Sequence, residues 1–204
     1  MDEKQHQGSE LAALARAILR GENVRASNTG SCMEDGDSGI KLHLGCGRLR
    51  WDGWTNVDLH SEVADVRCDL RRLDAFKDGS ADVACAVHVL EHFHEWEAMK
   101  LLLEWKRVLK PGGKLVLELP CLDKVLQYIR EAVEKREPMV GSFSWYVFWG
   151  DPRYKSEPMC HKWGYTIGAL QQALEGAGFE RVTFERPRYH FPARDMRATA
   201  YKPC

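Results

Sequence analysis

A short apolar run, Leu42-His43-Leu44, leads directly into Gly45-Cys46-Gly47. Glycine has no side chain, so it lets the backbone turn sharply after a strand and lets a ligand approach the main chain closely. Ordinary turns use glycine for the first reason alone, so a GxG motif by itself is weak evidence for a nucleotide site. The residues that follow must decide between these two interpretations.

Two carboxylates follow the glycines, each at the end of a strand-like run. Asp58 could accept the hydrogen bonds of a ribose diol, and Asp69 could meet an adenine amino group between Leu59 and Leu70. Alternatively, Asp58 only caps a turn and Asp69 is a surface acid beside an arginine pair. The interval from Gly47 to Asp58 is too short for the helix that holds a pyrophosphate in dinucleotide folds, which disfavours NAD and FAD.

A further apolar run ends in Val87-His88-Val89-Leu90-Glu91-His92. Polar groups therefore gather where a strand ends, at the carboxyl edge of the sheet, which is where open α/β folds bind their ligands. A single histidine in a protein is more often structural than functional, but this cluster is well placed for a binding role.

The elements that must position these residues alternate along the chain. Apolar runs separated by helical patterns predict a mostly parallel sheet covered by helices. We expect strands at 40–44, 55–59, 63–68, 81–89, 114–119, 179–185 and 197–201, and helices at 9–20, 95–109, 123–137 and 167–177. Residues 1–39 are predicted to form an N-terminal helix and a flexible linker. Residues 40–204 form one domain with a helical, aromatic-rich insertion at about 121–165.

The order and spacing of five motifs resemble those of class I S-adenosylmethionine-dependent methyltransferases, from Lys41 to about Glu185. The motifs are Leu-Gly-Cys-Gly (44–47), Asn-Val-Asp (56–58), Cys-Asp-Leu (68–70), Leu-Glu-His (90–92) and Arg-Val-Leu-Lys-Pro-Gly-Gly (107–113). The resemblance implies a Rossmann-like three-layer α/β sandwich whose sheet has seven strands, the last of them antiparallel.

The resemblance also implies S-adenosylmethionine as cofactor, S-adenosylhomocysteine as product, and a set of contact residues. Gly45, Cys46 and Gly47 would lie against the methionine part of the cofactor. Asp58 would bind the ribose, and three further groups would border the adenine or line the pocket: Leu59, Asp69 with Leu70, and Val87 with His88.

Two features depart from the common pattern of this family. The glycine loop lacks a third glycine, and the helix after it is shortened to residues 48–54. The short loop and the segment His161-Lys162-Trp163-Gly164-Tyr165-Thr166 resemble a small subgroup of bacterial and phage methyltransferases associated with cell-surface sugar pathways. This resemblance favours a sugar acceptor only weakly.

A methyl sulfonium is already activated, so the enzyme needs chiefly to align the acceptor with the methyl group and to exclude water. We expect no metal to be needed. For a hydroxyl acceptor, the candidates for a general base are His161, His92 and His88, with His161 in the insertion as the first choice. Packing or a surface hydrogen bond is the alternative role of each. A basic stretch, listed as Arg186, Arg188, His190, Arg194 and Arg197, could meet an acidic group on the acceptor or form a solvated strand edge.

Composition limits the partners. The 29 Lys and Arg nearly balance the 30 Asp and Glu without long single-sign blocks, which argues against nucleic acid as the partner. Seven cysteines without CxxC spacing indicate reduced thiols in a cytoplasmic protein. No signal pattern or apolar stretch predicts a membrane segment. We expect a monomer or homodimer.

The sequence leaves two functions open and disfavours a third, methylation of protein or nucleic acid, because it shows no basic arm, base-reading motif or appended recognition domain. The first is methyl transfer to a small molecule, with the hydroxyl of a carbohydrate as one candidate acceptor. The alternative is a catalytically idle cofactor-binding module with a regulatory or assembly role.

Overall fold

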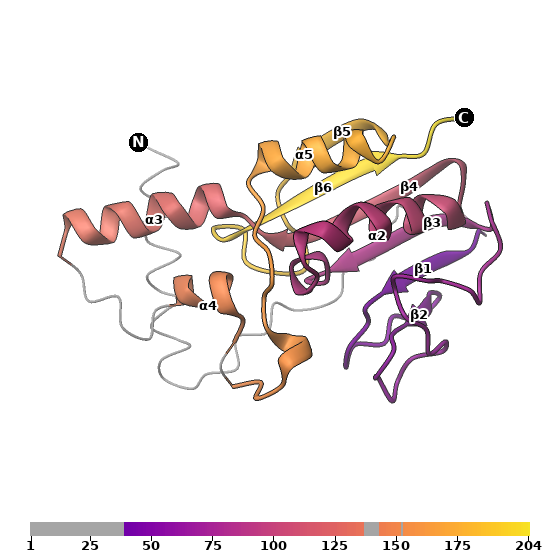
Figure 1. Ribbon diagram of the computed structural model, residues 1–204, viewed down its shortest axis with the longest axis horizontal. Coiled ribbons are helices and arrows are strands. Elements are labelled where there is room, and N and C mark those ends of the chain that lie inside the picture. The colour runs from indigo at the N-terminus through magenta and orange to yellow at the C-terminus, as the bar shows by residue number, and fades with distance from the viewer. Residues whose placement is uncertain (1–38, 137–142, 152) are drawn as a thin grey trace.

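The computed structural model describes residues 39–136, 143–151 and 153–204 (Figure 1). The predicted helix at 9–20 and nearly all of the predicted linker lie outside these residues. None of the helices in the described ranges is both long and apolar enough to cross a membrane.

Among the described residues, six strands form one mixed sheet in the order β2-β1-β3-β4-β6-β5. Neighbouring strands in the series β2, β1, β3 and β4 are parallel, whereas β6 is antiparallel to both β4 and β5. The strands are β1 (Lys41–Leu44), β2 (Thr55–Val57), β3 (Ala81–Val87), β4 (Leu109–Pro120), β5 (Glu180–Glu185) and β6 (Asp195–Tyr201). The Rossmann-like α/β class and the antiparallel last strand are thereby confirmed.

The predicted count of seven strands is wrong, because the run 63–68 forms no regular strand. Only an isolated parallel bridge joins Val57 to Val66. The amides of both Asp65 and Val66 donate to the carbonyl oxygen of Asn56, at 2.8 and 3.1 Å. Two consecutive donors on one acceptor break the even spacing of a parallel ladder. The pairing continues beyond them, with the amides of Asp58 and Cys68 donating to the carbonyl oxygens of Val66 and Asp58 at 3.2 and 3.4 Å, but it forms an isolated bridge and no regular strand.

The helices are α2 (Glu95–Val108), α3 (Leu122–Glu134), α4 (Phe143–Trp149) and α5 (Ile167–Gly176), with short 3-10 turns η1 (Leu90–His92) and η2 (Glu157–Met159). Helix α2 begins with a capping box between His94 and Glu97, which satisfies amides at the helix start. Its apolar stripe is buried, and the indole nitrogen of Trp105 donates to the carbonyl oxygen of Leu70 at 3.0 Å.

The two faces of the sheet differ in character. Helices α2 and α5 pack on one face (Figure 1), where the core contains Leu42 and Leu44 of β1 with aliphatic neighbours from β3, β4 and β6. On the other face a smaller cluster surrounds Cys85, and its cover comes from loop residues such as Trp54 and Tyr189. The described residues thus place loops, not a helix, over this second face.

The predicted insertion contains α3, α4 and η2, between β4 and α5. Its two ends meet, because Cys121 and Tyr165 form a parallel bridge and the amide of Leu122 donates to the carbonyl oxygen of Tyr165 at 2.9 Å. Helices α3 and α4 lie beyond the carboxyl ends of the central strands (Figure 1). That position faces the edge of the sheet at which ligands bind in such folds.

A buried ion pair connects β4 to β6 on the loop-covered face. Arg197 Nη1 lies 2.6 Å from Glu118 Oε1, and both side chains are almost completely buried. The same carboxylate accepts the amides of Arg188 and Tyr189 at 2.7 and 2.9 Å. It therefore fixes the loop before β6 as well as the strand pair.

Replacing Glu118 should be costly for stability. In Glu118→Gln the guanidinium of Arg197 stays buried but loses its charged partner, which costs about 3–5 kcal/mol. Glu185, the half-exposed second partner of Arg197 at 2.9 Å, provides the control, and Glu185→Gln should cost about 1 kcal/mol or less. Urea unfolding measures both values, and similar small losses in the two variants would contradict this assignment.

Candidate functional site

The glycine loop turns directly out of β1. The amides of Gly45 and Cys46 both donate to the carbonyl oxygen of Val57, at 2.8 and 3.2 Å, which joins the ends of β1 and β2. Gly45 has a φ of +70°, and an added Cβ there would lie 2.4 Å from Val89 Cγ2. Glycine is thus required at this position both by conformation and by the close approach of the β3–α2 connection.

Gly47 is held on both sides by the segment that follows β2. Its amide donates to Asp58 Oδ2 at 3.0 Å, and its carbonyl oxygen accepts the Ser61 hydroxyl. The other Asp58 oxygen accepts the amides of His60 and Ser61 at 2.8 and 3.0 Å. The predicted convergence of the glycine loop and Asp58 is therefore present, and Asp58 also performs the turn-capping role given as its alternative. Sequence reasoning did not identify Ser61.

The buried side chain of Asn56 holds the short segment 48–54 that follows the glycine loop. Asn56 Oδ1 accepts the amide of Trp51 at 2.8 Å and a ring N–H of His43 at 3.0 Å. Its Nδ2 donates to the carbonyl oxygens of Trp51 and Trp54, each at 3.1 Å, and to Asp65 Oδ2 at 2.9 Å. The His43 ring stacks on Trp51 with centroids 3.7 Å apart, and burial lowers the pKa of His43 to about 4. One side chain thus orders loop 48–54.

The residues predicted to surround the adenine have different environments. Leu59 is 44% exposed, so its side chain is available to a ligand, whereas Leu70 belongs to the main core. Asp69 forms a two-point ion pair with Arg71, at 3.0 Å from Nε and 2.7 Å from Nη2, and these hydrogen bonds lower the pKa of Asp69. The segment is near Asp58, since the amide of Cys68 donates to the Asp58 carbonyl oxygen at 3.4 Å. Contact with adenine stays a prediction.

His88 lies between two buried carboxylates. Its Nδ1 is 2.9 Å from Glu91 Oε1, and its Nε2 is 3.2 Å from Asp195 Oδ2. Burial alone lowers the pKa of His88, but the charges of Asp195 and Glu91 outweigh it and raise the value to about 9. The imidazolium therefore connects the β3–α2 turn to β6. The residue has a φ of +54°, a left-handed conformation uncommon outside glycine.

The remaining predicted residues lie close to this cluster. Val87 packs against the loop-covered core, and Cys46 is the buried member of the glycine loop. His92 and His161, two of the candidates for a general base, come together from η1 and from the insertion, with ring centroids 4.9 Å apart. Burial lowers the pKa of His161, which keeps its imidazole neutral. The structure thus brings the two candidates into one place.

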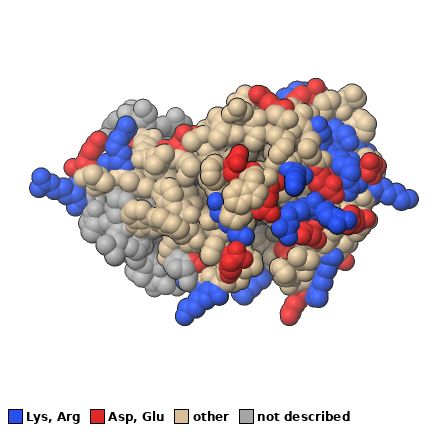
Figure 2. All heavy atoms as spheres, in the orientation of Figure 1, with Lys and Arg blue, Asp and Glu red and all other residues tan. Residues whose placement is uncertain are grey.

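The basic stretch near the C-terminus is neither a free anion site nor a solvated edge throughout. Arg197 is buried against Glu118, and Arg194 is buried with its guanidinium on Asp195. Arg188 remains half exposed beside Glu185, with 3.3 Å between Nη2 and Oε2. On the face drawn in Figure 2 positive and negative side chains are intermingled, so no broad field of one sign marks this face.

The chain was compared with known families and curated proteins. The model of the methyltransferase domain family matches residues 52–117, which is about a third of the chain and spans β2 to β4. Among curated proteins, no relative matches this chain in sequence.

Solved structures share the fold at low sequence identity. An S-adenosylmethionine-dependent methyltransferase from Methanosarcina mazei has a TM-score of 0.57 and 20% identity, over 84% of this chain and 94% of the other. One from Archaeoglobus fulgidus has a TM-score of 0.57 and 18% identity, over 96% and 94%. A Haloferax volcanii complex of the Trm112 methyltransferase activator with its methyltransferase partner has a TM-score of 0.56 and 13% identity, over 100% and 99%.

Within the glycine loop there is room for a ligand at Gly47 but none at Gly45. Substitution of each glycine by alanine tests this difference. Gly45→Ala should destabilise the fold, by about 1–2 kcal/mol for the left-handed backbone plus the contact with Val89. A second change, Val89→Ala, should recover only the contact part. An added Cβ at Gly47 meets no described atom within 4 Å, so Gly47→Ala should cost little more than the backbone strain.

The same pair of variants should separate in cofactor binding. The methyl group of Gly47→Ala occupies space that a ligand needs, so affinity for S-adenosylmethionine should fall about tenfold or more, in line with overpacking costs of about 1–3 kcal/mol. Calorimetric titration measures this affinity, and thermal unfolding reports the stability. Unchanged affinity in Gly47→Ala would mean that the cofactor does not lie against this loop.

Proposed function

We propose that this chain is a class I S-adenosylmethionine-dependent methyltransferase that transfers the methyl group to a small molecule. Its fold is shared with solved methyltransferases, and residues 52–117 match the methyltransferase domain family. A carbohydrate hydroxyl is the first candidate acceptor. The observation that carries the proposal is the convergence of Gly47 and Asp58 at the carboxyl edge of the sheet.

The geometry at this edge fits an adenosyl sulfonium. A carboxylate can accept about four hydrogen bonds. The Asp58 carboxylate accepts three from backbone amides, two at Oδ1 and one at Oδ2. One strong acceptor position therefore remains on Oδ2 for a ribose hydroxyl. The methionine part would lie along Gly45–Gly47, and exposed Leu59 would contact the adenine.

The acceptor would bind on the side of the insertion. Trp149 and Trp163 expose 63% and 46% of their surface, and aromatic faces of this kind stack on sugar rings. His161 Nδ1 donates to the Val147 carbonyl oxygen at 2.8 Å, which leaves the lone pair of Nε2 to receive a proton. His92 has the same arrangement, with Nδ1 donating to the Cys160 carbonyl oxygen at 3.2 Å.

The idle-module alternative predicts the same cofactor site without turnover. The proposal therefore requires both binding and reaction. Titration with S-adenosylmethionine tests the shared premise, and formation of S-adenosylhomocysteine with a panel of sugars, nucleotide sugars and phenols separates the two functions. Binding without product from any acceptor would favour the idle module.

Replacing the carboxylate of Asp58 should weaken the binding of S-adenosylmethionine. Asp58→Asn keeps one oxygen for the two amides of its own turn but turns an acceptor of the Gly47 amide into an NH₂ group. The loss of charge-assisted hydrogen bonds of about 1.5–3 kcal/mol predicts a dissociation constant roughly 10 to 100 times higher by calorimetry. Asp52→Asn, an exposed acid in the same region, is the control. Equal affinities in both variants would remove Asp58 from the site.

His161→Ala should slow methyl transfer far more than it weakens cofactor binding. Loss of a general base lowers kcat by about 10² to 10⁴, while the contacts of Gly47 and Asp58 stay intact. His94→Asn is the matched control, because asparagine also caps a helix and His94 lies at the start of α2. A parallel loss of kcat and affinity, or no loss of kcat, would exclude His161 from the reaction.

A further inference from the structure

We propose that Glu91, His92 and His161 form a binding site for a divalent transition-metal ion, with Zn²⁺ as the ion that fits the donor set. One potential ligand atom from each residue lies within 4.8 Å of the others. The inference depends on the contacts of these three residues and not on the proposed methyl transfer. A bound ion would take the Nε2 lone pair of His161, so His161 would then bind the metal instead of acting as the general base.

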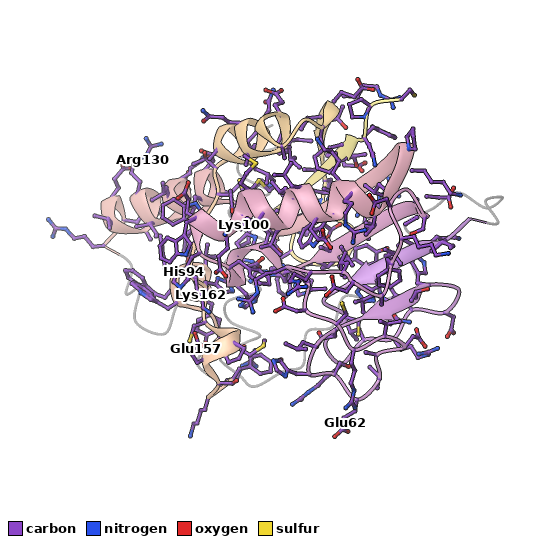
Figure 3. The ribbon with its side chains drawn as sticks, turned by 45° about the vertical axis from the view of Figure 1, so that its right-hand side comes forward. Glu62, His94, Lys100, Arg130, Glu157 and Lys162 are labelled. Atoms are coloured by element: carbon purple, nitrogen blue, oxygen red, sulfur yellow. The ribbon has the colours of Figure 1, made fainter. Side chains whose placement is uncertain are left out.

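The insertion is fixed to the β3–α2 connection at this point by backbone hydrogen bonds. The amides of Lys162 and Trp163 donate to the carbonyl oxygen of Glu91 at 2.8 and 3.2 Å. Figure 3 draws Lys162 and His94, the residue at which α2 begins, in the same region of that view. His161 therefore reaches Glu91 and His92 from a segment about 70 residues further along the chain, held in place by the main chain.

In both imidazoles the Nδ1 atom is hydrogen-bonded to a backbone carbonyl oxygen. His161 Nδ1 donates to the Val147 carbonyl oxygen at 2.8 Å, and His92 Nδ1 donates to the Cys160 carbonyl oxygen at 3.2 Å. A carbonyl oxygen can only accept, so each Nδ1 carries the proton and each Nε2 keeps its lone pair. Metal-binding histidines characteristically have this arrangement, in which a second group fixes the tautomer and the ring.

Glu91 supplies a buried carboxylate whose hydrogen bonds are incomplete. Its exposed fraction is 1%, and neither carboxylate oxygen accepts a hydrogen bond from any described residue. The imidazolium of His88 forms an ion pair with this carboxylate from one side, with 2.9 Å between Nδ1 and Oε1. A buried anion with unsatisfied acceptor positions is costly. A cation between Glu91, His92 and His161 would remove that cost.

The ligand set favours zinc among the biological divalent ions. Two imidazoles and one carboxylate are a common catalytic zinc set, with a fourth position left for an oxygen ligand. Bond lengths of about 2.0–2.2 Å place tetrahedral ligand atoms roughly 3.4 Å apart, so small side-chain rotations would close the observed triangle. Calcium and magnesium prefer all-oxygen ligands. The fourth position would accept water or an oxygen of the acceptor.

A second cluster of potential metal ligands differs from this one, because an arginine already balances the charge of its carboxylate. His88, His190 and Asp195 also lie within 4.8 Å of one another. However, Arg194 Nη2 lies 2.7 Å from Asp195 Oδ2 and 3.1 Å from His88 Nε2. The guanidinium already provides the positive charge there. Glu91 has His88 as its cationic neighbour, but no arginine or lysine among the described residues forms an ion pair with its carboxylate.

Metal binding can be measured directly on the full-length, untagged chain after dialysis against EDTA. Titration with ZnCl₂ alone should show one ion per chain. His92→Ala and His161→Ala should each weaken binding more than about tenfold, because even outer-shell changes cost about 10- to 100-fold. Co²⁺ in place of Zn²⁺ should give visible d–d absorption without a thiolate charge-transfer band.

Two control variants separate this site from incidental binding by other donors. Cys160→Ser removes an exposed thiol next to His161, and His94→Asn removes a neighbouring imidazole; both should keep the affinity of the original chain. Circular dichroism of the metal-free variants checks that each is folded.

Absence of stoichiometric Zn²⁺ binding would overturn the inference. So would retained affinity in the double variant of His92 and His161, or loss of affinity in Cys160→Ser. A parallel titration with S-adenosylmethionine distinguishes this failure from a failure of the proposed function. Cofactor binding with no metal binding would leave His161 as a free base, and metal binding without cofactor binding would remove the methyltransferase proposal alone.

Discussion

The Asp58 carboxylate accepts three backbone amides and thereby holds the glycine loop of β1 against the turn that follows β2. Without it, Gly47 would be a flexible link at the end of a strand only four residues long. Ser61 completes the arrangement from the other side by donating to the Gly47 carbonyl oxygen. The rigid bend leaves open space at Gly47, and a preorganised polar edge of this kind binds a ligand at a lower entropic cost.

Local patterns could predict the sheet, the helices of the main core and this bend. The alternation of apolar runs and the Lys-Pro-Gly-Gly stop after α2 are short-range signals, and the structure agrees with them. The prediction of a strand at 63–68 was wrong because strand formation there depends on pairing with β2, where the carbonyl oxygen of Asn56 accepts hydrogen bonds from two amides. Such pairing is a tertiary effect that the two valines of this segment do not reveal.

The polar cluster at the end of β3 illustrates the second limit of sequence reasoning. Glu91 and His92 stand together in a motif, so a site there could be predicted. The partners of His88 could not, since Asp195 is 107 residues away in sequence and becomes a neighbour only through the β4–β6 pairing. For the same reason Arg194 and Arg197 looked available to an acidic ligand, whereas both are buried in ion pairs. Long-range charge pairing, more than element prediction, decides which polar residues remain for function.

The central claim is that the adenosyl group of the cofactor lies across Gly47 and Asp58, and a crystal structure with S-adenosylhomocysteine tests it most directly. In that structure a ribose hydroxyl should lie within hydrogen-bonding distance of Asp58 Oδ2, and the amino-acid part of the ligand should lie along the Gly45–Gly47 main chain. A ligand bound elsewhere, or a ribose with no contact to Asp58, would contradict the account.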